Sequence, residues 1–218
     1  MNHEVEILSM KKLNHNVIQF ELERPDGYVF QSGQAIELTI DHPESKGPAP
    51  FTFTGLEDAP NLELMIKIYD NHAGLTSALS KKKPGEKVLI TDPRDSFKNK
   101  GHGVFLAGGA GITPFVALIR QPDNDKVPGQ SFLFFLNKTR EDIFLQDELN
   151  RLLGQRYVNI ITSDPSAPHV HINEDYIRKH ITNFSQPFYV CGPPGFTENI
   201  QNILAKIGAK EEMINISF

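Results

Sequence analysis

Residues 104–120 read VFLAGGAGITPFVALIR, and this stretch decides the fold of the second half of the chain. It predicts a short buried strand, a glycine-rich turn and a helix over residues 113–120. Glycines let a backbone approach a ligand closely, and the start of a helix offers unpaired N–H groups to a phosphate. Pro114 suits the first helical turn, because the N–H that it lacks would be unpaired there. The turn is either a phosphate-binding site or an ordinary tight connection, and it is neither a P-loop nor a strict GxGxxG motif.

The alternation of apolar runs and helical stretches continues beyond this turn. The next apolar runs span residues 131–136, 157–162 and 187–191, and the helical stretches after them span residues 143–153, 174–180 and about 192–207. Flanking Gly and Pro, together with β-branched and aromatic residues, identify the runs as strands. This alternation is typical of parallel βαβ units, so the second half is predicted to be a parallel-sheet α/β nucleotide-binding domain.

The first hundred residues have a different rhythm, in which apolar and polar residues alternate with period two. Strands are expected at residues 17–23, 36–40, 50–54, 62–69 and 87–91, and one brief helix at residues 75–81. About six short strands separated by Gly, Pro and Asp clusters are typical of a small antiparallel barrel or sandwich. A polar, glycine-containing stretch at residues 95–103 indicates two domains, residues 1–98 and 99–218.

Composition excludes several classes of function. The chain has 218 residues, of which 39% are hydrophobic and 22% charged, as in globular proteins. Its single cysteine excludes an intramolecular disulfide and a cluster held by the thiolates of this chain. The net charge of −5 argues against nucleic acid as a partner. No apolar run approaches the ~20 residues that span a bilayer, and no secretion signal is visible, so a cytoplasmic protein without a membrane span is expected. Scattered histidines predict no metal site.

Three more motifs could carry chemistry. Residues 191–195, CGPPG, follow the last internal strand at the sheet edge where ligands gather, although a cysteine there is often only a small buried residue. Residues 50–54, PFTFT, combine rings that can cover a flat cofactor with hydroxyls that can bond to a ring nitrogen, and they also suit an ordinary strand. Residues 74–77, GLTS, place hydroxyls at a helix start, where they either bind phosphate or cap the helix.

These four motifs occur in the order and spacing of one family. Over essentially its whole length the chain resembles the ferredoxin–NADP⁺ reductase superfamily, in which a flavin-binding barrel precedes a nicotinamide-nucleotide domain. Residues 108–114 match the family motif Gly-Gly-x-Gly-Ile/Val-Thr/Ala-Pro in full, residues 191–194 match Cys-Gly-Pro-Pro, and residues 49–52 match Arg-x-Tyr-Ser/Thr in part. The resemblance implies a six-stranded antiparallel Greek-key β-barrel followed by the parallel-sheet α/β domain.

The resemblance also implies roles for individual residues. FAD, in preference to FMN, binds the barrel, and NADH or NADPH binds the α/β domain as co-substrate. Three residues are implied in catalysis: Thr52 bonds near flavin N5, Cys191 lies beside the nicotinamide, and Phe218 covers the flavin ring. The implied cofactor-binding residues are Phe51, Thr52, Phe53, Gly74, Thr76, Ser77, Gly109, Gly111, Thr113, Pro114, Cys191, Gly192, Pro193 and Phe218.

Two departures from the family pattern affect cofactor binding. Ala49 stands where the family has an arginine that meets the flavin phosphate, so weakly held flavin is expected unless another nearby cation substitutes. Ser163-Asp164 stands where NADP-specific relatives have Ser-Arg, and a carboxylate there repels a 2′-phosphate. NADH is therefore favoured, although Lys138 and Arg140 at the preceding strand end could still receive a phosphate.

We therefore interpret the chain as a flavin-dependent oxidoreductase. It passes a hydride from NAD(P)H to FAD and then single electrons to a separate acceptor, for which flavodoxin or ferredoxin is expected. A monomer or weak dimer is expected. One alternative is the reductase component of an oxygenase or haem system. Two others are a flavin-binding electron-transfer or regulatory subunit that does not turn over alone, and a nucleotide-binding module without flavin.

Overall fold

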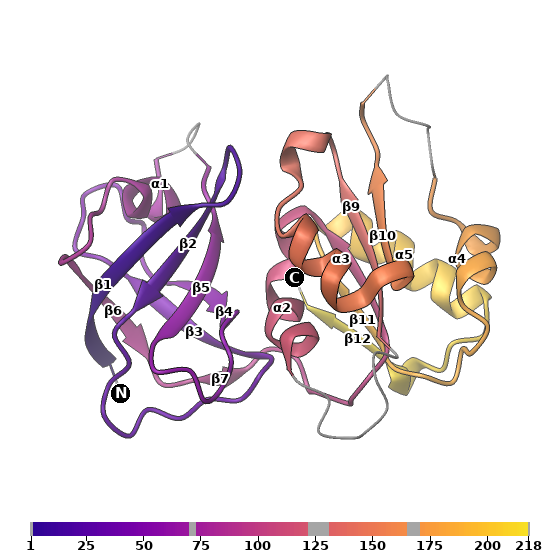
Figure 1. Cartoon of the computed structure of the whole chain (residues 1–218), viewed down its shortest axis with the longest axis horizontal. Helices are drawn as coiled ribbons and strands as arrows, with labels where there is room; N and C mark the ends of the chain where they lie inside the picture. Colours follow the sequence, from indigo (N-terminus) through magenta and orange to yellow (C-terminus); the bar gives the residue numbers. More distant parts are fainter. Residues whose placement is uncertain (1, 70–72, 122–130, 165–170, 218) are drawn as a thin grey trace. The chain divides into compact units, whose positions relative to one another are not determined.

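The computed structural model describes residues 2–69, 73–121, 131–164 and 171–217, and Figure 1 draws the whole chain coloured along the sequence. The chain forms two compact units. The first comprises Met1–Ser96 together with Thr113–Gln121, and the second comprises Phe97–Ile112 together with Pro122–Phe218. The division falls two residues before the predicted boundary after residue 98, because Phe97 is buried beside Tyr189 of the second unit.

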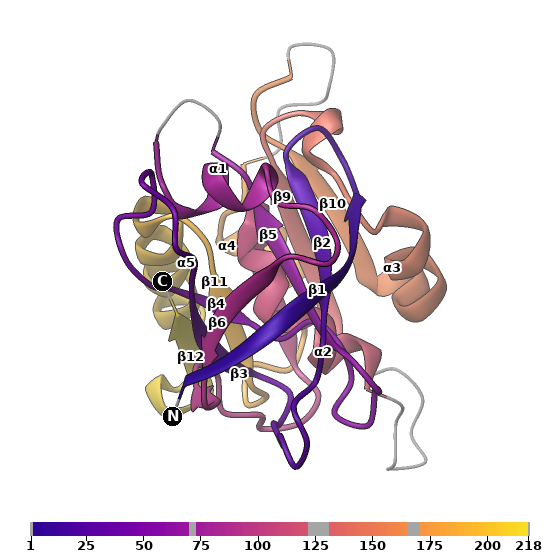
Figure 2. The same cartoon turned by 90° about the vertical axis from the view of Figure 1, so that its left-hand side faces the viewer.

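The first unit contains a nearly closed antiparallel barrel, as predicted (Figure 2). Its strands pair in the order β4-β3-β6-β1-β2-β5, and a bridge between Phe53 and Leu64 joins the two ends of that path. The short β7 pairs with β3 outside the path. The strands are β1 (Asn2–Lys12), β2 (Val17–Leu22), β3 (Gln34–Thr39), β4 (Ala49–Thr52), β5 (Leu62–Lys67), β6 (Lys87–Thr91) and β7 (Arg94–Asp95).

Alternation along these strands fills the barrel with apolar side chains. Strand β6 shows the pattern clearly, since Val88 and Ile90 are buried while Lys87 and Leu89 are exposed. Helix α1 (Leu75–Ser80) begins after Gly74 and buries Leu75 and Leu79 in the same core. The helix is therefore anchored to the barrel by its apolar side.

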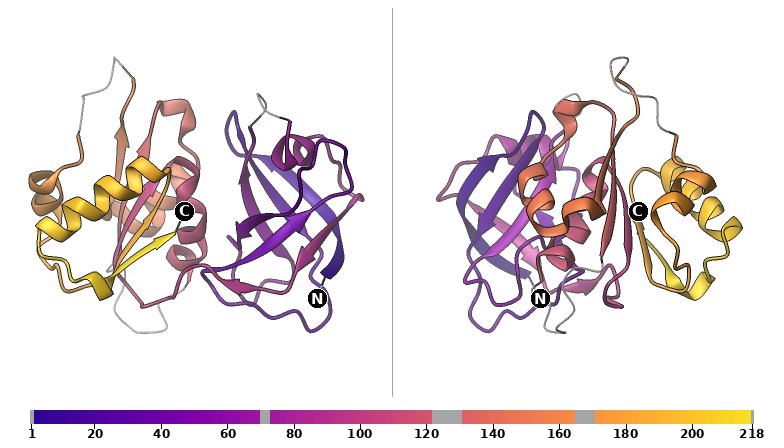
Figure 3. Two further views of the ribbon diagram at one scale, coloured as in Figure 1. Left: turned by 180° about the vertical axis from the view of Figure 1, so that it is seen from behind. Right: turned by 45° about the vertical axis from the view of Figure 1, so that its right-hand side comes forward.

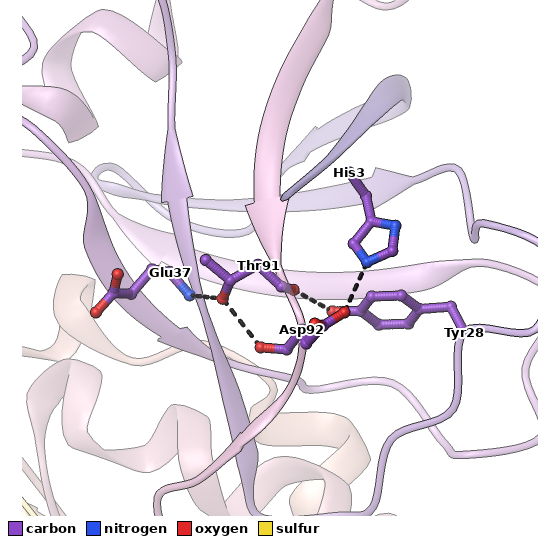
Figure 4. A network of polar contacts seen from close by, with 5 residues as sticks. All are labelled: His3, Tyr28, Glu37, Thr91 and Asp92. Atoms are coloured by element: carbon purple, nitrogen blue, oxygen red, sulfur yellow. Dashed lines mark hydrogen bonds and ion pairs between the residues drawn. The ribbon is translucent and has the colours of Figure 1, made fainter. Parts of the chain in front are cut away.

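A polar network holds the end of β6 against β1 and β3 (Figure 4). The buried Tyr28 hydroxyl donates to the Thr91 carbonyl at 2.6 Å, and burial raises the pKa of that hydroxyl well above its usual range. His3 Nε2 lies 2.8 Å from Asp92 Oδ1, and the Glu37 amide donates to Thr91 Oγ1 at 3.0 Å. These contacts satisfy polar groups at the barrel end, so we interpret the network as structural.

The second unit contains a five-stranded, wholly parallel sheet, which confirms the predicted α/β domain. The strands lie side by side in the order β10-β9-β8-β11-β12. Along the chain, β9 and β10 are added on one side of β8, and β11 and β12 are then added on its other side. The reversal between β8 and β11 is the topological switch point of a doubly wound sheet, where ligands bind at the carboxyl ends of the strands. The strands are β8 (Val104–Gly108), β9 (Phe132–Asn137), β10 (Tyr157–Ile161), β11 (Phe188–Cys191) and β12 (Ile214–Ser217).

Helices cover both faces of this sheet (Figure 3). On one face, Leu106, Phe134 and Val190 pack with α4 (Glu174–His180) and α5 (Pro194–Lys206) in a single buried cluster. On the other face, Phe135 meets Phe144 edge to face just before α3 (Gln146–Leu153). Helix α2 (Thr113–Arg120) follows the 3₁₀ turn η1 (Gly109–Ile112) and belongs to the first unit. Among the described residues, none of the helices combines the length and the hydropathy needed to cross a membrane.

Candidate functional site

The two glycine-containing turns of the second unit meet at the switch point. Strands β8 and β11 are adjacent and parallel, and Cys191 is the strand partner of Ala107. The turn at residues 108–112 therefore leaves the sheet beside the turn at residues 191–193. The prediction that these two motifs share one sheet edge is confirmed.

Gly111 packs directly against the backbone of the neighbouring turn. A Cβ at Gly111 would overlap the carbonyl oxygen of Cys191 and would lie 2.7 Å from the amide nitrogen of Gly192. Gly109 has a φ of +56°, in the left-handed region that favours glycine. Glycine is therefore required in this turn for its positive φ and for close backbone packing.

Helix α5 begins at the carboxyl edge of the sheet, directly after Pro193. No side chain caps this end, Pro194 has no N–H, and the N–H groups of Phe196 and Thr197 donate to the Pro193 carbonyl oxygen. A helix of 13 residues carries a partial positive charge at this end, which attracts a phosphate group. The switch point thus combines close-packed glycines with a helix start, the arrangement that binds the pyrophosphate of a dinucleotide.

Sequence reasoning did not single out Phe196, which packs behind both turns. A Cβ at Gly108 would lie 3.2 Å from Phe196 Cγ, and one at Gly192 would lie 2.6 Å from Phe196 Cδ1. The ring fills the space that these two glycines leave, so it supports the turns from the protein side. The signal was available, because Phe196 is the first aromatic residue after the CGPPG motif and stands in the first turn of a helix.

Cys191 ends β11 and presents a neutral thiol. Its side chain is 9% exposed, and burial raises the pKa of the thiol to about 11 despite an opposing hydrogen bond from the Gly192 backbone. The thiolate is the nucleophilic form of cysteine, so Cys191 is protonated and unreactive near neutral pH. Its thiol therefore offers a small polarizable surface at the end of β11 and no nucleophile.

The raised pKa predicts slow alkylation of Cys191 in the folded protein. At pH 8 a thiol of pKa 11 has roughly 200-fold less thiolate than one of pKa about 8.5, so reaction with iodoacetamide should slow by at least that factor on folding. The folded-state pKa of the thiol also exceeds its unfolded value. The free energy of unfolding is therefore highest below pH ~8.5 and falls as the pH rises towards 11, where the unfolded thiol has already lost its proton. Mass spectrometry of native and urea-unfolded protein measures the difference, and equal rates would contradict it.

The ends of β9 and β10 form a second polar region in this unit. Asp164 Oδ2 lies 3.9 Å from Arg140 Nε, with the aspartate side chain 21% exposed and the arginine side chain 71% exposed. Ser163 N donates to the Lys138 carbonyl at 2.9 Å, which fixes the two chain segments side by side. Asp164 thus balances the charge of Arg140, one of the two cations that could receive a 2′-phosphate.

In the first unit, the residues of the predicted flavin motif lie on β4. Phe51 and Thr52 are half-buried and pair with Ile36 and Ala35 of β3. Phe51 packs partly against the barrel core and keeps part of its side chain exposed, as a ring that covers a cofactor must. Their roles towards a flavin stay predictions.

Phe53 lies in the barrel core. Its side chain is fully buried and stacks on Phe30 with ring centroids 4.1 Å apart. Alternate residues of a strand share a face, so the Phe53 side chain points to the same inward side as that of Phe51. Its role towards a cofactor stays a prediction.

The helix-start residues of the first unit differ in their accessibility. Gly74 and Thr76 are half-buried, and Thr76 Oγ1 accepts a hydrogen bond from Tyr69 N at 3.4 Å. Ser77 is only 7% exposed, since it faces the barrel core with its helix. Phe218 lies outside the described residues, immediately after Ser217, the strand partner of Cys191. The expected functions of these four residues stay predictions.

The remaining predicted contact residues occupy the two turns and the start of α2. Thr113 is half-buried and Pro114 is buried in the first turn of α2, while Pro193 is exposed.

Within the described ranges, no group of three or more His, Cys, Asp or Glu side chains could hold a metal ion.

Comparisons with known proteins agree with this geometry. Residues 105–202 match the family model described as "Oxidoreductase NAD-binding domain". A curated relative, NADH-cytochrome b5 reductase 2 of Botryotinia fuckeliana, is 27% identical over 88% of this chain and 62% of its own length. Methane monooxygenase component C of Methylosinus trichosporium is 28% identical over 67% of this chain and 46% of its own length. The chain thus spans about half to two thirds of these two relatives.

Solved structures share the whole architecture. A ferredoxin NADP⁺ reductase from Neisseria gonorrhoeae superposes with a TM-score of 0.81 and 21% identity, covering 99% of this chain and 98% of that one. The cytochrome b5 reductase domain of Ulva prolifera nitrate reductase gives 0.83 and 19%, covering 100% and 97%.

The chain therefore combines an antiparallel barrel with an oxidoreductase NAD-binding domain that has glycine turns at its switch point. Its two-domain fold is that of the ferredoxin NADP⁺ reductase and of the cytochrome b5 reductase domain described above.

Proposed function

We propose that this chain binds FAD on its barrel and NAD(P)H at the switch point, and that it passes electrons from the nucleotide to a separate electron-carrier protein. The proposal rests on one observation: the turns at Gly111 and Cys191 pack against each other at the carboxyl ends of the sheet strands, within the part of the chain that matches an oxidoreductase NAD-binding domain. A flavin, when bound, accepts a hydride from the nucleotide and releases electrons singly.

The residues of this chain then act by positioning. The Gly111 turn and the start of α5 would hold the pyrophosphate, because the glycines keep side chains out of the turn and the helix end carries a partial positive charge. The neutral Cys191 thiol lies beside the nicotinamide and adds no charge to compete with hydride transfer. On β4, the Phe51 ring packs against the isoalloxazine and the Thr52 hydroxyl bonds to it.

The acceptor is proposed to be a small redox protein, with flavodoxin or ferredoxin as the first candidate. The names of the relatives favour a second class of acceptor, which is either a haem protein such as cytochrome b5 or another component of an oxygenase. Lys81 and Lys82, which follow α1, give little support to the docking of an acidic partner protein beside that helix. Lys81 Nζ lies 2.7 Å from Glu44 Oε2 and Lys82 Nζ lies 2.9 Å from Glu86 Oε1, so both charges are balanced within the chain.

The visible spectrum of the purified protein tests the proposal directly. The protein is recorded alone, after addition of FAD, and then anaerobically after addition of NADH. Flavin bands that bleach with NADH are the expected result. Bands that stay oxidised would favour the subunit that does not turn over alone, and a protein that never takes up flavin would favour a nucleotide-binding module without it.

Asp164 predicts a preference for NADH over NADPH. A carboxylate near a 2′-phosphate is repelled by about 1 kcal/mol or more at ~4 Å, so we expect kcat/KM to favour NADH by at least about fivefold. The Asp164→Asn variant should reduce that NADH-to-NADPH ratio by roughly fivefold or more, because it removes the repulsion and also leaves Arg140 available to the phosphate. Steady-state rates with both coenzymes measure the ratio, and an unaltered chain that prefers NADPH would refute the prediction.

A further inference from the structure

A partly buried ion pair links helix α2 to the barrel strand β5 within the first unit. Arg120, the last residue of α2, places Nη1 2.6 Å from Oε1 of Glu63, the second residue of β5. The two side chains are 18% and 19% exposed, respectively. Both residues belong to the same compact unit. The pair is therefore largely withdrawn from solvent and only weakly screened by salt.

The Glu63 carboxylate is held by neutral partners as well. Oε1 accepts a hydrogen bond from Thr54 Oγ1 at 2.7 Å, and Oε2 accepts one from Gln19 Nε2 at 2.6 Å. Arg120 Nη1 donates in addition to the Thr54 carbonyl oxygen at 2.9 Å. Thr54 is fully buried, so its two contacts cannot be replaced by water without opening the barrel surface. The network thus defines one geometry for both charged groups.

This network connects two segments that the proposed function uses. Thr54 stands two residues after Thr52 of the proposed flavin strand. Helix α2 starts at Thr113, immediately after the η1 turn that contains Gly111, and ends at Arg120. A buried ion pair adds little net stability compared with an apolar pair of the same volume, but its directional contacts restrict how the two segments can be oriented.

We propose that Glu63 and Arg120 are positioning residues for hydride transfer. They lock the carboxyl end of α2 to β5 and to Thr54, so that the helix after the nucleotide turn and the strand of the flavin motif move as one body. The inference rests on the proposed function. Breaking the pair is expected to slow the transfer step while both cofactors still bind, because neither side chain belongs to the turns or to the strand proposed to contact them.

The test compares anaerobic stopped-flow reduction of bound FAD by NADH in the unaltered chain and in Glu63→Gln/Arg120→Met. The double variant removes both charges, so no buried charge is left unpaired. At saturating NADH we expect flavin reduction to slow at least tenfold, with the NADH dissociation constant and the flavin spectrum changed less than twofold. A primary isotope effect with 4-deuterated NADH should report that the slowed step is hydride transfer.

Lys87→Met serves as the matched control. Its ion pair with Glu4 is equally short, at 2.7 Å, but both side chains are 58% exposed. This variant should reduce flavin within twofold of the unaltered rate. Arg120→Lys keeps the positive charge but loses the planar guanidinium, so its rate of flavin reduction should lie between those of the unaltered chain and the double variant. If the double variant does not fold, Arg120→Lys is tested in its place.

A folded double variant, or Arg120→Lys in its place, that transfers hydride at the unaltered rate would overturn the inference while leaving the proposed function intact. If the unaltered chain carries FAD but is not reduced by NADH, the proposed function fails and the inference fails with it. Slower reduction accompanied by loss of FAD or of NADH binding would also overturn it, because the pair would then act on binding.

Discussion

Replacing Gly111 by alanine is expected to lower kcat/KM for NADH by more than 100-fold and to destabilise the protein. The added Cβ would overlap the Cys191 carbonyl oxygen, and that oxygen belongs to the end of β11, a strand held on both sides by β8 and β12. Overpacking of this kind typically costs about 1–3 kcal/mol. For a chain of this size, a loss of about 3 kcal/mol lowers the melting temperature by roughly 6–12 °C. Calorimetry and steady-state kinetics measure the two effects.

Gly195→Ala is the control for stability. It makes the same substitution in the first turn of α5, but its Cβ would meet no atom within 4 Å. Because alanine favours a helix more than glycine does, the melting temperature should stay unchanged or rise slightly. A Gly111→Ala protein as stable and as active as the unaltered chain would show that the two turns do not need this close approach.

Replacing Ala49 by arginine is expected to tighten FAD binding by ten- to more than 100-fold. A charge-assisted hydrogen bond to phosphate contributes about 1.5–3 kcal/mol, and each ~1.4 kcal/mol changes a dissociation constant tenfold. Ala49 is half-buried at the start of β4, where a long stem can lie along the barrel and leave its charged head in water. Titration of the apoprotein with FAD by calorimetry measures the change.

Ala49→Met is the matched control, since it adds a stem of similar length without charge. It should leave the FAD affinity within about threefold of the unaltered chain, and the gain from arginine should shrink at high salt. The prediction fails if the unaltered chain already binds FAD with sub-nanomolar affinity, or if methionine and arginine tighten binding equally.

Local elements with strong signals were predicted closely. Helix α2 and helix α4 have the predicted bounds, because Pro114 in the first turn marks the start of α2 and Asn173 caps α4. Strand β6 also agrees with its prediction. Strands β1 and β12 were missed, since β1 alternates irregularly across a bulge and β12 is a short tail whose partner, β11, lies far away in the sequence.

The sequence by itself determined the two-domain class and the positions of the glycine turns, because residue periodicity and glycine content are properties of neighbouring residues. Only the tertiary structure decided that Gly111 touches the Cys191 backbone, that Phe53 points into the core and that Arg120 meets Glu63. These contacts join residues up to 80 positions apart in the chain. They depend on the strand order and on which face each side chain takes, and packing of the whole chain sets both.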